Sequence, residues 1–347
     1  MHTNAKRALA MAAGAGAVLA LRALRGRASY DFRDKSVLIT GGSRGLGLVL
    51  ARELAAQGAR LTIIARDRVE LEQARADLAG RGAEVLAFAC DVRDQADVQS
   101  AITRVIARYS RIDVLINNAG VIQAGPVEHM QVADFEDALN THLWGPLYTM
   151  LAATPHMRAQ GGGRVVNISS IGGKLAVPHL VPYTTSKFAL AGLSGGMRAE
   201  LARDNITITT VYPGLMRTGS HLNALFKGRH AEEFTWFSII DSLPISSIDA
   251  RRAARQIIEA CRRGDPQLII SIQAKTIALL TAVFPNLSAR VLELMNQLLP
   301  KPAGSEGNAT RTGWESQSRL APSLLTQLSD RAAEENNGLH GHAPVTE

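Results

Sequence analysis

Two side chains with acid–base chemistry, Tyr183 and Lys187, lie four residues apart in the stretch Tyr-Thr-Thr-Ser-Lys. Side chains at this spacing share one face of a helix, and the run 187–201 that follows is rich in apolar residues and contains no proline. A free tyrosine has a pKa of about 10, and a neighbouring cation lowers it by favouring the phenolate. We therefore expect the pair to donate and accept a proton near neutral pH, with a chance pair on a helix surface as the alternative.

The rest of the chain alternates short apolar runs with longer amphipathic ones. The short runs predict strands at 36–40, 60–65, 84–89, 112–116, 164–168, 207–212 and 267–271. The longer runs predict helices at 47–57, 69–80, 95–109, 135–160 and 250–263, besides the helix of Tyr183. Strands separated by helices in this rhythm predict a doubly wound, parallel α/β sheet of the Rossmann type in a single domain. Ligands of such sheets bind beyond the carboxyl ends of the strands.

A glycine-rich turn joins the first strand to the first helix, with the sequence Thr-Gly-Gly-Ser-Arg-Gly-Leu-Gly at 40–47. Glycines at this place permit a tight turn and let a pyrophosphate approach the helix N-terminus. Their spacing differs from the common Gly-x-Gly-x-x-Gly pattern, so a plain loop is the alternative. The candidate cofactor-binding residues of this turn are Gly41, Ser43, Arg44, Gly45, Leu46 and Gly47.

An arginine at the tip of the second strand indicates which cofactor the turn would hold. Arg66, together with Arg44, suits the 2′-phosphate of NADP(H), whereas the neighbouring Asp67 suits the ribose hydroxyl of NAD(H). We therefore expect NADP(H), with NAD(H) as the less favoured alternative. Further candidate cofactor contacts follow the third and fourth strands, where turn formation alone is the alternative: Asp91, Val92, Asn118, Ala119 and Gly120.

These motifs, with Ser170 and Pro213-Gly214, occur in the order typical of the short-chain dehydrogenase/reductase family, and the chain resembles that family over about residues 35–272. The resemblance implies a Rossmann-type fold and an oxidoreductase that interconverts a carbonyl and an alcohol with a nicotinamide cofactor. It implies that Tyr183 exchanges a proton with the substrate oxygen. It also implies that Lys187 lowers the pKa of Tyr183 and holds the nicotinamide ribose.

The resemblance implies roles for other residues as well. Ser170, rather than Ser169, would bond the substrate oxygen, because its spacing of 13 residues from Tyr183 is the usual one. Asn140 matches the family asparagine that positions a proton-relay water, with an ordinary polar helix residue as the alternative. Similar proteins are usually homo-dimers or homo-tetramers through the helices that carry Asn140 and Tyr183. The residues that would border the nicotinamide are Pro213, Gly214 and Thr218.

The substrate side of the chain is dense in large apolar residues. Within 216–248 these are Leu222, Leu225, Phe226, Phe234, Trp236, Phe237, Ile239, Ile240 and Leu243. We expect a lid that closes over an apolar substrate, such as a lipid-like ketone or aldehyde, an acyl chain or a steroid. A place in the core or in a dimer interface is an equal alternative. The segment 273–300 is expected to form an apolar helical extension that packs on the domain, or else lies on a membrane.

The two ends of the chain differ in composition from its middle. An uncharged apolar run at 8–21 lies between basic residues, and extending it to residue 24 brings it close to the length that spans a bilayer. We therefore expect residues 1–30 to be a membrane anchor, with a surface-lying or disordered tail, or a signal peptide, as alternatives. The basic residues after the run would keep the domain on the cytoplasmic face; without an anchor the protein would be cytoplasmic. Residues 301–347, rich in Gly, Ser, Asn, Pro and Glu, are expected to be disordered.

Composition argues against several other classes of protein. The formal net charge is +7, but the basic residues are scattered and aromatic residues make up 5%, so no nucleic-acid partner is expected. Cys90 and Cys261 are far apart and predict neither a disulfide framework nor a metal site. His142 and His179 lie near the motifs and are assigned no role. We predict an NADP(H)-dependent oxidoreductase of lipid metabolism, with a non-catalytic, nucleotide-binding scaffold of the same fold as the alternative.

Overall fold

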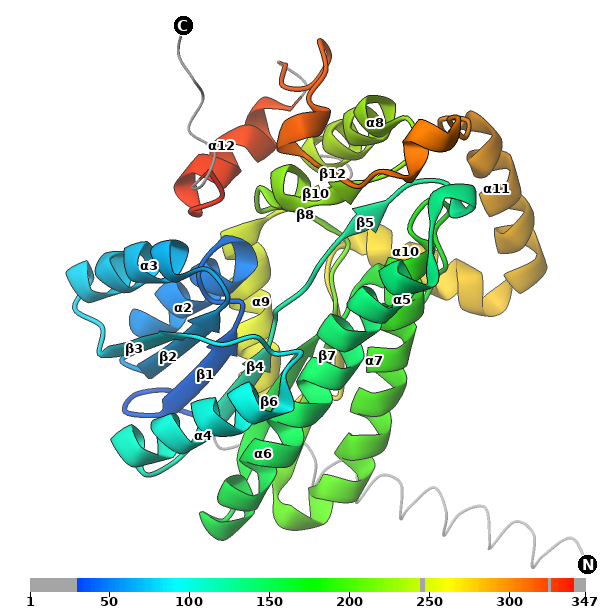
Figure 1. Cartoon of the computed structure of the whole chain (residues 1–347). Helices are drawn as coiled ribbons and strands as arrows, with labels where there is room; N and C mark the ends of the chain where they lie inside the picture. The colour runs from blue at the N-terminus through cyan, green and yellow to red at the C-terminus, as the bar shows by residue number, and fades with distance from the viewer. Residues whose placement is uncertain (1–29, 244–246, 324–325, 340–347) are drawn as a thin grey trace, which may run out of the picture. The chain divides into compact units, whose positions relative to one another are not determined.

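The computed structural model describes residues 30–243, 247–323 and 326–339 (Figure 1). The chain divides into two units, Met1–Asp31 and Phe32–Glu347. The predicted membrane anchor at 1–30 lies almost wholly outside the described residues. All the helices and strands that the structure describes belong to the second unit.

A seven-stranded sheet forms the centre of this unit, in the order β11-β7-β6-β4-β1-β2-β3. Its strands are β1 (Ser36–Thr40), β2 (Arg60–Ala65), β3 (Val85–Ala89), β4 (Val114–Asn117), β6 (Gly163–Ile168), β7 (Ile206–Tyr212) and β11 (Gln267–Ile269). All neighbouring strands pair in parallel. The strand order reverses between β1 and β4, which is where ligands of doubly wound sheets bind. The predicted parallel α/β fold is confirmed.

Helices cover both faces of the sheet, as apolar strands without polar alternation require (Figure 1). On one face α2 (Gly45–Ala55) packs against α9 (Ala250–Arg263) and α3 (Arg68–Gly80). On the other, α4 (Gln95–Tyr109) packs against α6 (Gly145–Ala159), and α5 (Val132–Leu139) packs against α7 (Val181–Leu201). All five residues of β1 are buried between these two layers.

The predicted helix 135–160 is one helical stretch with a wider turn in the middle. The π-helical turn Asn140–Trp144 joins α5 to α6, and the N–H of Gly145 bonds the carbonyl of Asn140 five residues earlier. Pro146 lies in the first turn of α6, directly after this π turn. The π turns found in proteins often lie at functional sites.

A second apolar core lies above the carboxyl edge of the sheet. Its elements are two small sheets, β5 (Gln123–Ala124) with β9 (Leu225–Phe226) and β12 (Arg311–Thr312), and β8 (Leu215–Arg217) with β10 (Ser247–Asp249), together with α8 (His230–Ser242) and α12 (Gln327–Glu335). The buried residues of this core are Ala124, Leu222, Ala224, Phe226, Phe234, Phe237, Ala321 and Ala333. The region 216–248 therefore places most of its large apolar side chains in a core, rather than in a lid over substrate.

The C-terminal part of the chain also differs from the prediction. Residues 301–347 were expected to be disordered, yet within 301–323 and 326–339 the structure contains β12 and α12, and both pack on this second core. Ala321 and Ala333 are fully buried in it. The polar composition of this stretch hid the few small apolar residues that make these contacts.

A helical hairpin, α10 (Ile272–Val283) and α11 (Pro285–Leu298), follows the last strand of the main sheet. The two helices contact each other and meet at a bend of 119°. Ala274 is the buried residue of α10, and α11 has none. Among the described residues, no single helix is long and apolar enough to cross a membrane; only this bent pair has a suitable combined length and composition.

The second core gives a test of the fold. Phe234 is 1% exposed and lies edge-on to Phe226, with ring centroids 5.6 Å apart. Replacing it by alanine removes most of these contacts and leaves a cavity, so Phe234→Ala should lower the free energy of unfolding by about 3–5 kcal/mol. Denaturant unfolding measures the loss. Ile240→Ala, at a 40% exposed position of the same helix, is the matched control, and equal losses in both variants would contradict a core at this place.

Candidate active site

Tyr183 and Lys187 lie in the first two turns of α7, with Tyr183 half-buried and Lys187 only 4% exposed. The Nζ atom of Lys187 lies 5.5 Å from the centroid of the Tyr183 ring and donates a 3.0 Å hydrogen bond to the carbonyl of Ile168 at the end of β6. Burial lowers the pKa of Lys187 to about 7. The predicted pair is therefore brought together, at the carboxyl edge of the sheet.

The pKa of Tyr183 differs from the prediction. We expected Lys187 to lower it, but burial is the largest influence and raises it, while a hydrogen bond with the side chain of Ser170 lowers it in part. The ammonium of Lys187 points its hydrogen bond at the Ile168 carbonyl. The phenol is thus held in its protonated form at neutral pH, which is the form that can donate a proton.

The choice between two neighbouring serines follows from their partners. The hydroxyl of Ser169 is buried and donates to the Lys187 carbonyl over 2.9 Å. The hydroxyl of Ser170 is half-buried and accepts the N–H of Gly172 over 3.0 Å. A Cβ on Gly172 would lie 3.4 Å from this hydroxyl and 3.3 Å from Cε1 of Tyr183. The structure therefore places Ser170, as predicted, beside the phenol.

Asn140, by contrast, does not lie with these residues. Its side chain is exposed, whereas the histidine two positions later, His142, is 1% exposed. The His142 ring meets the Tyr183 ring edge-on with centroids 5.6 Å apart. The assignment of Asn140 to the site is thus a prediction that the structure contradicts, because His142, not Asn140, lies on the buried face of the helical stretch.

The hydrogen bonds of His142 define its state. The N–H of Val121 donates to Nε2 over 3.1 Å, so Nε2 carries no proton and Nδ1 carries it. Nδ1 lies 2.8 Å from the hydroxyl of Ser186, which in turn donates to the Tyr183 carbonyl over 2.7 Å. Burial, and secondarily the charge of Lys187, lowers the pKa of His142 well below its usual value. The ring is therefore neutral and fixed at both nitrogens.

One feature of the sequence could have pointed to His142. The buried residues of the long helical stretch include Ala138, His142, Gly145 and Thr149, at intervals of three and four. Asn140 falls between these positions, on the opposite face of a regular helix. We assigned neither histidine a role, and His179 proves to bond Glu233 of the second core region over 2.8 Å.

The glycine turn has the shape that a bound phosphate needs. Gly41 and Gly45 have φ of +63° and +54°, a conformation that favours glycine. A Cβ on Gly47 would lie 2.0 Å from the carbonyl oxygen of Gly41, and a Cβ on Gly41 would lie 2.8 Å from the Cα of Ala119. Only glycine fits these places. The cradle and the N-terminus of α2 behind it suit the pyrophosphate of a dinucleotide.

The predicted cofactor residue Asn118 holds this turn in place. Its Nδ2 donates to the carbonyls of Thr40 and Gly41 over 3.1 and 3.0 Å. The hydroxyl of Thr40 accepts the N–H groups of Asn118 and Ala119, each over 3.0 Å. The ends of β1 and β4 are therefore tied together at the point where the strand order reverses. Gly120 follows them, and a Cβ there would lie 3.0 Å from Nε2 of His142.

The two arginines expected at the 2′-phosphate lie in different surroundings. Arg44 pairs with the buried Glu70, which also accepts the hydroxyl of Ser43 over 2.9 Å. Arg66 is exposed at the tip of β2. Asp67 caps α3, because its Oδ1 accepts the N–H groups of Val69 and Glu70. The Asp67 carboxylate is thus engaged by its own chain.

The remaining candidates form the rest of the crevice wall. Asp91 pairs with Arg93, whose hydrogen bonds hold the pKa of Asp91 below its usual value against the effect of burial. Val92 is buried against Gly145. The carbonyl of Pro213 accepts the N–H of Ile171 over 2.7 Å, which ties the segment of Gly214 to the segment of Ser170. The position of a Gly45 Cβ is 3.7 Å from the carbonyl oxygen of Thr218, so Thr218 lies directly across from the glycine turn.

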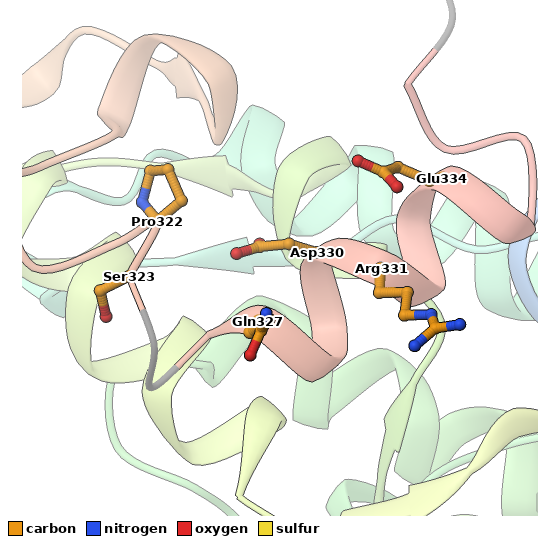
Figure 2. A pocket seen from close by; sticks show the side chains of 6 residues that line it. All are labelled: Pro322, Ser323, Gln327, Asp330, Arg331 and Glu334. Carbon is orange, nitrogen blue, oxygen red and sulfur yellow. The ribbon is translucent and has the colours of Figure 1, made fainter.

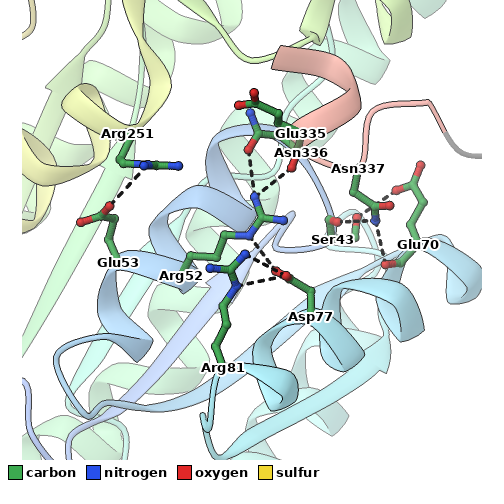
Figure 3. Close-up of polar contacts among 10 residues, drawn as sticks. All are labelled: Ser43, Arg52, Glu53, Glu70, Asp77, Arg81, Arg251, Glu335, Asn336 and Asn337. Carbon is green, nitrogen blue, oxygen red and sulfur yellow. Dashed lines mark hydrogen bonds and ion pairs between the residues drawn. The ribbon is translucent and has the colours of Figure 1, made fainter. Parts of the chain in front are cut away.

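One further neighbour of this turn has no counterpart among the predicted site residues. The N–H of Gly45 donates to the carbonyl of Asn336 over 2.9 Å, and Nδ2 of Asn337 donates to the Ser43 carbonyl over 2.9 Å. Figure 3 shows both asparagines just beyond the end of α12, directed at the turn and at Arg52. The C-terminal part of the described chain thus lies against the candidate cofactor site.

A surface hollow of about 500 Å³ is lined by residues of the same C-terminal region. Figure 2 shows its lining, which consists of Pro322, Ser323, Gln327, Asp330, Arg331 and Glu334. None of these residues belongs to the catalytic or cofactor set. Across the described ranges, no group of three or more His, Cys, Asp or Glu residues is placed to hold a metal ion.

Comparison with known proteins agrees with this geometry. A family model described as short chain dehydrogenase matches residues 35–225. A granaticin polyketide synthase putative ketoacyl reductase of Streptomyces violaceoruber is 34% identical over 229 residues, which are 64% of this chain and 84% of that protein. A Drosophila melanogaster protein named dehydrogenase/reductase SDR family protein 7-like is 31% identical over 258 residues, 73% of this chain and 78% of that one.

Comparison with solved structures indicates the same family. A variant of the actinorhodin polyketide ketoreductase, solved with NADPH, superposes with a TM-score of 0.62 at 28% identity, over 68% of this chain and 95% of that one. The chain belongs to the short-chain dehydrogenase/reductase family, whose members are oxidoreductases that interconvert an alcohol and a carbonyl with a nicotinamide cofactor.

Proposed function

We propose that the protein is an NADP(H)-dependent reductase of an apolar carbonyl compound, lipid-like, acyl or steroid-like, with Tyr183 as its general acid. The observation that carries the proposal is the close approach of Ser170 and Tyr183, next to the buried Lys187: a Cβ on Gly172 would lie 3.4 Å from Oγ of Ser170 and 3.3 Å from Cε1 of Tyr183. Two hydroxyl groups that meet in this way can both reach one substrate oxygen. Their place at the carboxyl edge of the sheet is where a cofactor on the glycine turn would meet the substrate.

The chemistry follows from the states of these groups. The nicotinamide cofactor supplies the hydride for reduction, or accepts it for oxidation. Ser170 donates a hydrogen bond to the carbonyl oxygen as negative charge develops there. Tyr183, whose raised pKa keeps the phenol protonated, donates the proton that completes the alcohol. Lys187 beneath it offsets the charge left on the phenolate.

The neutral His142 supports this arrangement and does not take part in proton transfer. Burial lowers its pKa well below the usual value, and both nitrogens are already bonded, to the N–H of Val121 and to Ser186. It is a positioning residue that fixes the Tyr183 ring from the side. Its ring stands where we had expected an asparagine to hold a water.

The proposed preference for NADP(H) rests on the charged groups near the tip of β2 and on the contacts that each of them makes. Asp67, the group that would have suited a ribose hydroxyl, caps α3. Arg44 is paired with Glu70, so its charge is partly offset. Arg66 is exposed beside them, and a guanidinium there can bond a phosphate in two places. The similar actinorhodin ketoreductase was solved with NADPH.

The apolar character of the substrate rests on residues beside the site rather than on the lid. Most large side chains of 216–248 are used in the second core. The residues that directly follow Ser170 and Gly214, however, are Ile171, Leu215 and Met216, all half-buried. Such side chains favour an apolar substrate around the reacting carbonyl.

Assembly and location are part of the same proposal. We propose a homo-dimer or homo-tetramer through α5, α6 and α7, because Trp144, Leu151 and Phe188 are exposed apolar residues on this side. We also propose that residues 8–24, which lie outside the described residues, hold the protein on the cytoplasmic face of a membrane. The apolar run between basic residues is what supports this.

The proton-transfer role can be tested with Tyr183→Phe. This change removes the proton donor and keeps the ring, so kcat for NADPH-dependent reduction of apolar ketones and aldehydes should fall by about 10²–10⁴-fold. NADPH binding, followed by its fluorescence, should change little. Tyr148→Phe, at a half-buried tyrosine of α6, is the control. Unchanged turnover in the Tyr183 variant would show that another group supplies the proton.

Cofactor choice can be tested with Arg66→Ala. Loss of the guanidinium should raise the Kd for NADPH by about 10–100-fold, because a charge-assisted contact to a phosphate is lost. The Kd for NADH, which lacks this phosphate, should stay within about twofold. Titration calorimetry measures both. Arg68→Ala, at an exposed arginine two residues along, is the control, and an equal loss for NADPH and NADH would rule out Arg66 as the phosphate ligand.

A further inference from the structure

In the first helix of the hairpin 272–298, small side chains face the domain and large apolar side chains face outward. The face of α10 toward the domain carries the small residues Ala274, Ala278 and Thr281, of which Ala274 is buried and the others are half-buried. The opposite face carries the large residues Ile272, Leu279 and Val283, which are 79%, 64% and 55% exposed. A helix of a water-soluble surface shows the reverse pattern.

The second helix of the hairpin repeats this exposure. Leu287, Val291, Leu294 and Leu298 recur at intervals of four, three and four, so they form one stripe, and each is more than half exposed. A polar stripe, made of Asn286, Arg290, Glu293 and Gln297, lies alongside it at the same intervals. The helix is therefore amphipathic, and its apolar stripe faces outward. Contiguous exposed apolar surface of this kind marks an interaction site.

The chemistry of this surface favours lipid over protein. The exposed large side chains of the hairpin are aliphatic except for Phe284, with no tryptophan or tyrosine in 272–298, whereas protein interfaces are enriched in aromatic residues. Over 272–301 the charged residues are Lys275, Arg290 and Lys301 against Glu293, three basic to one acidic. A positive, aliphatic, amphipathic surface complements anionic phospholipid.

The geometry sets how the hairpin can meet a membrane. Helices of 12 and 14 residues extend roughly 18 and 21 Å, less than the hydrocarbon core of about 30 Å. With a bend of 119° between them, they do not form a straight span. We propose that the hairpin 272–298 lies in the surface of an anionic bilayer, with the stripe of Leu287 and Leu294 among the acyl chains.

This membrane surface borders the catalytic crevice. A Cβ on Gly214 would lie 3.5 Å from the Cβ of Ala274 in α10, so the hairpin leaves the domain beside the residues that follow the site. The inference stands on exposure and charge, and it does not depend on the proposed reaction. If the reaction is as proposed, an apolar substrate dissolved in the bilayer would have a short way to Ser170 and Tyr183.

The test uses the full-length protein and one introduced thiol. The two native cysteines are buried, so Leu287→Cys can be labelled alone with an environment-sensitive fluorophore. On vesicles of phosphatidylcholine with phosphatidylglycerol, brominated acyl chains should quench this probe several-fold more than a probe at Gln297→Cys on the polar stripe. Binding to these vesicles should be roughly tenfold or more tighter than to phosphatidylcholine alone.

Three results would overturn the proposal. The first is equal quenching at both positions, which would indicate a helix surrounded by lipid. The second is no quenching at Leu287 while the protein floats with the vesicles, which would leave the attachment to residues 8–24. The third is a probe at Leu287 that becomes buried with rising protein concentration in the absence of lipid, which would identify a second copy of the chain as the partner.

Residues 327–339, which we call the strap, carry a second and independent inference. The strap bridges the two sides of the cofactor crevice. On one side Gly45 and Ser43 of the glycine turn bond Asn336 and Asn337. On the other side, Ala333 packs closely on Gly219, because a Cβ added to Gly219 would lie 2.4 Å from the Cα of Ala333. The side-chain amide of Asn223 also donates to the carbonyl of Gly338 over 3.2 Å.

The strap occupies a backbone N–H, that of Gly45, which a bound anion would need. The N–H of Gly45 is a donor at the N-terminus of α2, where a phosphate binds, and it is bonded to the carbonyl of Asn336. Arg52 reinforces the contact, because its Nη1 donates to the Glu335 carbonyl and to Oδ1 of Asn336, each over 3.0 Å (Figure 3). One N–H cannot serve both partners. We infer that the strap competes with the cofactor for the glycine turn and must leave before it binds, an inference that rests on the cofactor assignment above.

Asn337→Ala tests this competition. The change removes the two bonds from Nδ2 to the carbonyls of Ser43 and Glu70, and alanine is less suited than asparagine to the φ of +60° at this position. A loosened strap should lower the apparent Kd for NADPH by roughly three- to tenfold, because the binding-competent fraction rises. Glu334→Ala, at an exposed position of α12, should leave the Kd unchanged.

Amide hydrogen exchange gives a second readout. In the unaltered protein NADPH should speed exchange in residues 330–339, because the displaced strap loses its hydrogen bonds. An unchanged or higher Kd in the Asn337 variant, or slower exchange on adding NADPH, would overturn the competition and identify the strap as a clamp over bound cofactor. If neither NADPH nor NADH binds to either protein, the cofactor assignment fails as well.

Discussion

The buried ammonium group of Lys187 constrains how the catalytic helix sits on the sheet. Burial makes a charge costly there and lowers the pKa of Lys187 to about 7, and Nζ donates its hydrogen bond to the carbonyl of Ile168 at the end of β6. The next residue of that strand end, Ser169, bonds the backbone carbonyl of the same lysine. With the lysine held at both its ends, α7 cannot slide along the sheet without breaking these bonds. The meeting of Ser170 and Tyr183 follows from this fixed placement.

The glycine turn is positioned by a second set of bonds that needs no ligand. Thr40 and Asn118 tie the ends of β1 and β4, and the contacts around Gly41 and Gly47 leave no space for a side chain. Because the cradle is already formed, it loses little entropy when it binds, once the strap 327–339 has left it. The second apolar core then joins the region after Gly214 to the C-terminal part of the chain, so the cofactor side and the substrate side of the crevice share one support.

Much of the fold and of the site could be predicted from the sequence, because the signals were local. The apolar strand runs, the glycine turn and the spacing from Ser170 to Tyr183 each depend on residues close together in the chain. Asn140 was misplaced because an asparagine in this stretch suggested the family role, whereas the buried face of the helix passes through Ala138, His142 and Gly145. The roles of Phe226 and Phe234 were open because a lid and a core use the same side chains. Packing of the C-terminal part depends on Ala321 and Ala333, whose partners lie about a hundred residues away in sequence.

The wide turn at Asn140–Trp144 has a consequence for how such a site can change over time. In a regular helix each residue advances about 100° around the axis, so one extra residue in a turn shifts the phase of everything before it relative to everything after it. Here His142 lies within that turn, with its ring at the edge of the Tyr183 ring. Gain or loss of a single codon in this turn, with no replacement of any side chain, is therefore enough to exchange the neighbour of the catalytic tyrosine.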